Sequence, residues 1–138
     1  MADTFQIEIV TPERAVVRDS ATEAQIPGKN GYLGILPGHA PLISELAVGE
    51  ISYRKPSGDV AHLAVAWGFA EVLPDKVTIL AETAEKAEEI DVARAEKQKE
   101  RAEQRLNSQD PETDFERARV ALERSLVRLQ VAEHRHGE

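Results

Sequence analysis

The residues with the clearest potential for chemistry are arginines near the C-terminus, because their spacing places them on two helical faces. Arg94, Arg101 and Arg105 are spaced by seven and four positions, and Arg117, Arg124, Arg128 and Arg135 by seven, four and seven. Residues at these spacings share one face of an α-helix. Rows of guanidinium groups can bind phosphate bidentately. The alternative, a solvated face neutralised by glutamates such as Glu100 and Glu123, is favoured by charge pattern alone.

The histidines give weaker indications of chemistry. His39 lies in a turn, but the sequence places no serine, cysteine or paired carboxylate beside it, so we expect it to pack or to contact a partner rather than to act as a base. His134 and His136 could share a metal ion, yet they stand at a chain end that we expect to fray, and we expect their closeness to be coincidental. We expect Trp67 to fill the core or an interface.

A stretch rich in glycine and proline, residues 31–42, predicts a tight corner between two strands. Gly38 follows Pro37, which suits a type II turn over residues 36–39 with positive φ at the glycine. Pro41 then keeps the preceding residue out of helical conformation. Corners of this kind are typical of the rim of a sandwich or barrel.

Short alternating segments predict a β-rich N-terminal domain. About nine strands are expected, at 5–9, 15–18, 22–26, 32–36, 42–46, 50–55, 60–66, 69–73 and 77–81. Residues 1–84 hold seven of the eight glycines, six of the seven prolines and only 17 of the 42 charged residues, which separates them from the rest of the chain. The prediction is an antiparallel β-sandwich in residues 1–84.

Residues 85–138 predict a two-helix antiparallel hairpin. A run without glycine or proline at 84–106 forms the first expected helix, with a thin face of Ala95, Ala102 and Leu106. Asp110 can cap the second helix with Pro111 at its first position. Its expected apolar stripe comprises Phe115, Ala118, Leu122, Leu126, Leu129 and Ala132.

Charge and composition exclude several classes of partner. A net charge of −8 argues against nucleic acid and anionic lipid as primary partners. The absence of cysteine excludes disulfides and thiolate metal sites. No basic segment precedes an apolar one at the N-terminus, and no apolar run is long enough to span a membrane. We therefore expect any membrane association to go through other proteins.

Four segments in order resemble the epsilon subunit of F-type rotary ATP synthases. They are residues 31–42, 68–72 (GFAEV), 74–82 (PDKVTILAE) and 90–95 (IDVARA), and together they span nearly the whole chain. The chain departs from the family at Trp67, where relatives usually carry a small residue.

The resemblance implies a non-catalytic rotor subunit that couples proton-driven rotation to ATP synthesis. By resemblance, the sandwich joins the gamma subunit to the ring of c subunits, and the hairpin restrains ATP hydrolysis by contacting the alpha and beta subunits. The complex would lie at the cytoplasmic face of the bacterial plasma membrane. ATP would be a regulatory ligand, with no cofactor for catalysis. The residues implied for ATP are Glu85, Ile90, Asp91, Arg94, Ala95, Arg101, Arg124 and Arg128.

Two other functions remain open from the sequence. A free-standing nucleotide-binding sensor would stay monomeric in the presence of those partner subunits. A sandwich enzyme using His39 would show turnover as the isolated chain. Co-purification with gamma separates both from the rotor subunit.

Overall fold

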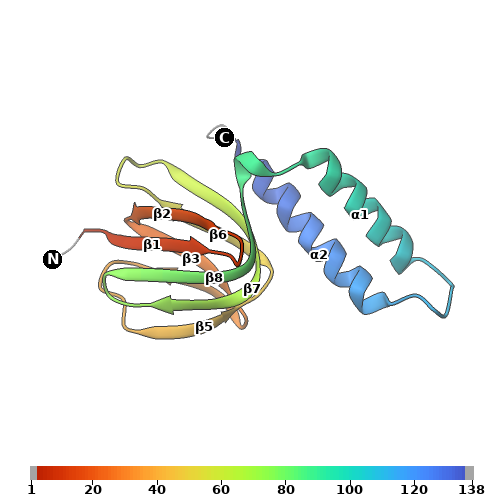
Figure 1. Cartoon of the computed structure of the whole chain (residues 1–138), viewed down its shortest axis with the longest axis horizontal. Helices are drawn as coiled ribbons and strands as arrows, with labels where there is room; N and C mark the ends of the chain where they lie inside the picture. The colour runs from red at the N-terminus through yellow and green to blue at the C-terminus, as the bar shows by residue number, and fades with distance from the viewer. Residues whose placement is uncertain (1–2, 136–138) are drawn as a thin grey trace.

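The computed structural model describes residues 3–135, which form a β-sandwich with a helical hairpin against one end (Figure 1). The strands are β1 (Phe5–Val10), β2 (Ala15–Ala21), β3 (Glu23–Gly28), β4 (Gly31–Ile35), β5 (Leu42–Leu46), β6 (Gly49–Arg54), β7 (Val60–Val72) and β8 (Lys76–Lys86). A 3-10 helix (Ala87–Glu89) leads to α1 (Val92–Leu106) and α2 (Phe115–Ala132). The predicted fold class is confirmed.

The sandwich is one hydrogen-bonded sheet folded over a common core. Its order is β2-β1-β8-β7-β5-β3-β4, with β6 pairing both β3 and β7. Alternation along the strands buries one side of each, and fully buried members include Ile7, Ile26, Ile51, Leu63 and Ile79. Among the described strands only β1 and β8 pair in parallel. β1 lies between its hairpin partner β2 and the last strand, β8.

Eight strands replace the nine or so expected, because β7 is a single strand where two were predicted. Its N-terminal part pairs with β6 and its C-terminal part with β5. Between these parts Trp67 has φ 52° and Gly68 has φ 124°. The gap expected at residues 67–68 is therefore a local change of backbone direction within one continuous strand.

The corner at residues 36–39 is a turn of the kind predicted. Gly38 has φ 86°, and the His39 N–H donates to Leu36 O at 3.1 Å. His39 Nδ1 lies 2.7 Å from Ala40 O, so the ring contacts the backbone of the following residue.

Both helices begin later than expected. The first was predicted over 84–106, but β8 continues to Lys86 and α1 starts at Val92, where Asp91 accepts from the Arg94 N–H at 3.0 Å as the N-cap. The second was predicted to start at Pro111, but Asp114 is its cap and α2 starts at Phe115. Asp110 instead accepts from the Glu112 N–H at 2.9 Å within the connecting loop.

Small side chains pack the hairpin. α1 buries Ala95 and Ala102, and α2 buries Ala118, Ser125, Val131 and Ala132. The predicted stripe is wrong in part, since Phe115 and Leu126 are 45% and 47% exposed. α2 lies between α1 and the sandwich (Figure 1), so it presents two contact faces where one stripe was expected. No helix within residues 3–135 is long and apolar enough to cross a membrane.

Candidate functional site

The candidate site is the contact between the hairpin and the sandwich, where residues from β7, β8 and both helices meet. Its apolar part is a small cluster of Ala64, Ala87, Ile90, Val131 and Ala132, with Val92 and Val127 packed against it. Ile90 is only 3% exposed because the link between the 3-10 helix and α1 turns it into this cluster. The area involved is small, since most members are alanine or valine.

Arg128 provides the polar part of this contact. Its Nε and Nη2 donate to the two carboxylate oxygens of Glu85 at 2.7 and 3.2 Å, and its Nη1 donates to Gln98 Oε1 at 2.7 Å. The arginine side chain is 16% exposed, which keeps the pair partly shielded from water. One guanidinium on α2 thus joins β8 to α1.

Arg124, one turn earlier on α2, lies over the ring of Trp67 at 5.5 Å from its centroid. This distance allows a cation–π contact. The positive φ of Trp67 belongs to the irregular point of β7, so the same backbone irregularity that bends the strand lies beneath the helix. Trp67 is therefore half-buried at the interface between the two parts.

The space between these residues is too small for a nucleotide as the structure stands. A cavity of about 20 Å³ is lined by Val48, Ala64, Val65, Ala66, Thr83, Glu85, Arg124, Val127 and Arg128. Ligand pockets for molecules of drug size have volumes of roughly 300–1,000 Å³. Binding of ATP here requires the helices or side chains to move.

The structure brings together part of the set implied for ATP. Glu85, Arg124 and Arg128 meet in the interface. Ile90 and Ala95 are buried in helix and sandwich packing, and the Asp91 carboxylate caps α1. Arg94 and Arg101 are exposed on α1. Arg105, the third member of the α1 row, is exposed as well.

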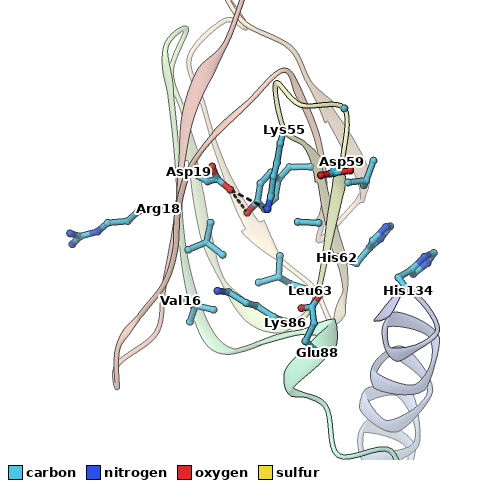
Figure 2. Close-up of a pocket in the computed structure, with 15 residues that line it drawn as sticks. Val16, Arg18, Asp19, Lys55, Asp59, His62, Leu63, Lys86, Glu88 and His134 are labelled. Carbon is cyan, nitrogen blue, oxygen red and sulfur yellow. Dashed lines mark hydrogen bonds and ion pairs between the residues drawn. The ribbon is translucent and has the colours of Figure 1, made fainter. Parts of the chain in front are cut away.

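A larger hollow of about 780 Å³ lies on the other side of the hairpin contact, beside β2, the β6–β7 turn and the end of α2 (Figure 2). Asp19 there accepts from the Tyr53 hydroxyl at 3.0 Å and lies 3.9 Å from Lys55 Nζ. Burial raises the pKa of Tyr53, and the hydrogen bond to Asp19 raises it further. His62 and His134 lie side by side at its edge (Figure 2).

Sequence reasoning missed the grouping of His62 with His134 and with Glu50 of β6. His134 was considered only with His136, which lies outside the described residues. Glu50 and His62 share a face because Ser52 pairs with His62 and lies two residues from Glu50. An alternating pattern around Glu50 and His62 could have suggested a shared face, but the arrival of His134 depends on helix docking.

The outer face of the sandwich carries an exposed apolar patch, formed by Ile43, Phe69 and Leu80. These side chains are 70%, 53% and 55% exposed. They lie on the neighbouring strands β5, β7 and β8, with Phe69 paired to Leu80 and to Glu45, two residues from Ile43. Contiguous exposed apolar side chains of this kind often mark an interface with another protein.

Comparison with known proteins identifies both parts of the chain. Residues 4–87 match the family model "ATP synthase, Delta/Epsilon chain, beta-sandwich domain", and residues 88–133 match "ATP synthase, Delta/Epsilon chain, long alpha-helix domain". The ATP synthase epsilon chain of Koribacter versatilis is 70% identical over 112 residues, covering 81% of this chain and 78% of that protein. The ATP synthase epsilon chain of Geotalea daltonii is 47% identical over 133 residues, covering 96% of each.

A solved structure shares the fold. A chain in the Euglena gracilis mitochondrial ATP synthase (OSCP/F1/c-ring, rotational state 1) superimposes with a TM-score of 0.83 at 24% identity, covering 97% of this chain and 84% of that one.

Proposed function

The chain belongs to the ATP synthase delta/epsilon chain family, and from this membership we propose that it is a central-stalk subunit of the rotor of an F-type, proton-driven ATP synthase. It has no catalytic activity of its own. The sandwich assembles the stalk, and the hairpin regulates ATP hydrolysis. The complex lies at the cytoplasmic face of the bacterial plasma membrane, which this subunit reaches only through its partners.

For assembly, the exposed patch of Ile43, Phe69 and Leu80 supports a role in binding another stalk subunit. Burying such side chains would remove apolar area from water that the isolated chain leaves exposed. We assign this face to the gamma subunit, and the sandwich as a whole to the attachment of gamma to the c-subunit ring. Phe69→Asp should therefore weaken co-purification with gamma. Val60→Asp, at an exposed apolar position on the same strand, is the matched control.

The proposed regulatory role is supported by the small contact that holds the hairpin against the sandwich. This contact includes a small aliphatic cluster, one arginine–carboxylate pair, one arginine–tryptophan contact and the stacked rings of His62 and His134. Contacts of this size can be exchanged for contacts with another protein at a cost of a few kcal/mol. The released helices would carry their arginines to acidic side chains on the alpha and beta subunits.

ATP is the proposed ligand that keeps the hairpin folded down. Its phosphates would bind Arg128 in place of the Glu85 carboxylate and would also contact Arg94 and Arg101. Asp91, Ile90 and Ala95 would flank the nucleotide. Ligand at about 100 times its dissociation constant stabilises the state that it binds by roughly 2.7 kcal/mol. That energy is comparable with the expected cost of release, so nucleotide could set the position of the hairpin.

Reconstitution tests the division of labour. The full chain and a form ending at Lys86 are each added to a complex that lacks this subunit. Both should co-purify with gamma, and the shortened form should give an equal or higher rate of ATP hydrolysis. Failure of the shortened form to assemble would contradict the proposal. A full chain that remains monomeric with gamma present but binds ATP would instead identify a free-standing nucleotide sensor.

Titration calorimetry tests the ATP site separately. Arg94→Ala should weaken ATP binding more than Arg117→Ala, because Arg117 is an exposed arginine outside the 90–95 segment. Equal losses, or no binding of ATP at millimolar concentration, would leave these arginines as solvated or partner-facing residues.

A further inference from the structure

We propose that Glu50, His62 and His134 bind a transition-metal cation of the Zn²⁺ type, which fastens the C-terminal end of α2 to the sandwich. Glu50 comes from β6, His62 from β7 and His134 from the turn that follows α2. The candidate ligand atoms of the three side chains all lie within 4.8 Å of one another. The group thus joins the N-terminal and C-terminal parts of the chain.

Packing on both sides fixes the positions of the three side chains. Glu50 and His62 project from one face of the β6–β7 ladder. Val131 and Ala132 anchor the end of α2 in the apolar cluster, and the His134 N–H donates to Val131 O at 3.0 Å. The imidazole rings of His62 and His134 are stacked, with 3.7 Å between their centroids and 7° between their planes. Figure 2 shows the two rings side by side.

The carboxylate of Glu50 is incompletely satisfied in this arrangement. Its Oε2 lies 3.1 Å from His62 Nδ1, whereas its Oε1 is buried and has no hydrogen-bond partner among the described residues. His134 Nε2 is 3.9 Å from that oxygen. A buried acceptor without a partner is unfavourable, and a cation bound to Oε1 would supply the missing partner.

The ligand types determine which cations fit. Two imidazoles and one carboxylate form a ligand set used by zinc sites, with water in the fourth position. Mg²⁺ and Ca²⁺ prefer oxygen ligands, so two histidines disfavour both. The exposed fractions of the Glu50, His62 and His134 side chains are 18%, 16% and 35%, which leaves a path for the ion and a water molecule.

The required movement is small. Tetrahedral zinc with bonds of about 2.1 Å places its ligand atoms about 3.4 Å apart. The ligand atoms, which now lie within 4.8 Å of one another, must therefore approach by up to about 1.4 Å, with the two rings rotating out of their stack. These are side-chain rotations, so they leave the β6–β7 ladder in place.

A metal ion bound across this contact favours the docked hairpin. At a free concentration of about 100 times its dissociation constant, a ligand specific for the docked state increases the ratio of docked to released molecules about 100-fold. The site consists of this side-chain cluster alone, so zinc binding can be tested independently of the ATP synthase role and of ATP binding.

Calorimetric titration of the isolated full chain with ZnCl₂ tests the site. We expect binding of one ion, with affinity reduced about tenfold or more in Glu50→Gln, His62→Ala and His134→Ala. His39→Ala, at a histidine of the distant corner, is the matched control and should bind as the unmodified chain does. Circular dichroism of each variant checks that it is folded.

Further measurements test the ligands, the cation and the fastening role one by one. If Glu50→Gln and His62→Ala bind Zn²⁺ normally while His136→Ala does not, the ion is held by the chain end and the proposal is wrong. MgCl₂ at the same concentration should give no comparable heat, and equal binding would exclude the assigned cation class. Zn²⁺ should also slow amide exchange in the last turns of α2, and unchanged exchange would refute the fastening role.

Discussion

At the scale of single residues, the backbone at Trp67 and Gly68 decides how β7 runs beneath the hairpin. Both have positive φ, at 52° and 124°. A β-carbon at Gly68 would lie 1.9 Å from Leu80 O and 2.9 Å from Ala81 Cα. The backbone of β7 at Gly68 therefore lies too close to β8 for a residue with a β-carbon. Glycine is required here both by this close approach and by the positive φ.

Gly68→Ala should destabilise the sandwich by about 3 kcal/mol or more, because strain at positive φ adds to a clash with backbone atoms. Denaturant unfolding monitored by circular dichroism measures the loss. Gly34→Ala is the control, since its β-carbon meets nothing within 4 Å. Similar stability of the two variants would mean that β7 and β8 can separate without penalty.

The pKa of Glu89 predicts a dependence on pH at the junction of the two parts. Burial raises this pKa, but the Lys86 N–H and the Arg14 guanidinium, which both donate to the carboxylate, outweigh burial and hold the pKa below its usual range. A carboxyl whose pKa is lowered by folding stabilises the protein above its unfolded pKa, and this contribution is lost as the pH falls through the folded value.

Glu89→Gln should therefore lower the melting temperature at neutral pH, and the difference from the unmodified chain should shrink as the pH falls below about 4.5. Melting curves at a series of pH values measure the effect. Glu88→Gln, at an exposed neighbour outside the Arg14 ion pair, provides the comparison. A difference that is constant with pH would mean that the carboxylate has no role in this junction.

At the scale of elements, α2 acts as the connection between α1 and the sandwich. One side packs small residues against α1, and the other carries Arg124 and Arg128 to β7 and β8. α1 has few apolar side chains of its own, burying only Ala95 and Ala102. The position of α1 therefore depends on α2, and that of α2 depends on these arginines together with the apolar cluster at its C-terminal end.

Arg128→Ala should loosen the whole hairpin while leaving the sandwich folded. Loss of charged hydrogen bonds to Glu85 and Gln98 in a partly shielded site removes about 1–3 kcal/mol. Hydrogen exchange should accelerate by about tenfold or more in α1 and α2 but not in the core strands. Arg119→Ala is the control, because within residues 3–135 the ion pairs of Arg119 are with Glu116 and Glu123, on the exposed side of α2. Equal effects would show that Arg128 has no special part in docking.

At the scale of the whole molecule, the sandwich and the hairpin have separate apolar clusters. The main core cluster draws its buried members only from residues 5–84. The cluster beneath the hairpin is separate and consists of alanine, valine and one isoleucine. Separate cores allow the hairpin to leave without opening the sandwich.

A chain ending at Lys86 should accordingly fold and melt cooperatively, because β8 is kept to its last residue and no member of the main core is removed. The complementary peptide, residues 87–138, should be largely unstructured, since short helices are marginal without tertiary packing. Circular dichroism of the two pieces measures both outcomes. An unfolded N-terminal piece would mean that the sandwich needs the hairpin.

Much of the architecture was predictable because its signals are local. Alternating apolar residues and the Pro37-Gly38 turn indicated the strands and their corner, and the change of period after residue 83 indicated the hairpin. The element boundaries were less predictable. Asp91 caps α1, where β8 first continues to Lys86 through its pairing with β7. Asp114 rather than the expected Asp110 caps α2, because Asp110 and Ser108 form hydrogen bonds within the connecting loop.

The sequence by itself determined the fold class, the family resemblance and the presence of arginine rows, because composition and spacing carry each of these. Only the tertiary structure decided which arginines are engaged: Arg128 meets Glu85, 43 positions away, and Arg124 meets Trp67. It also brought Glu50 and His62 to His134. Contacts between distant residues depend on strand register and on where a helix docks, and both are set by the packing of the whole chain rather than by any local pattern.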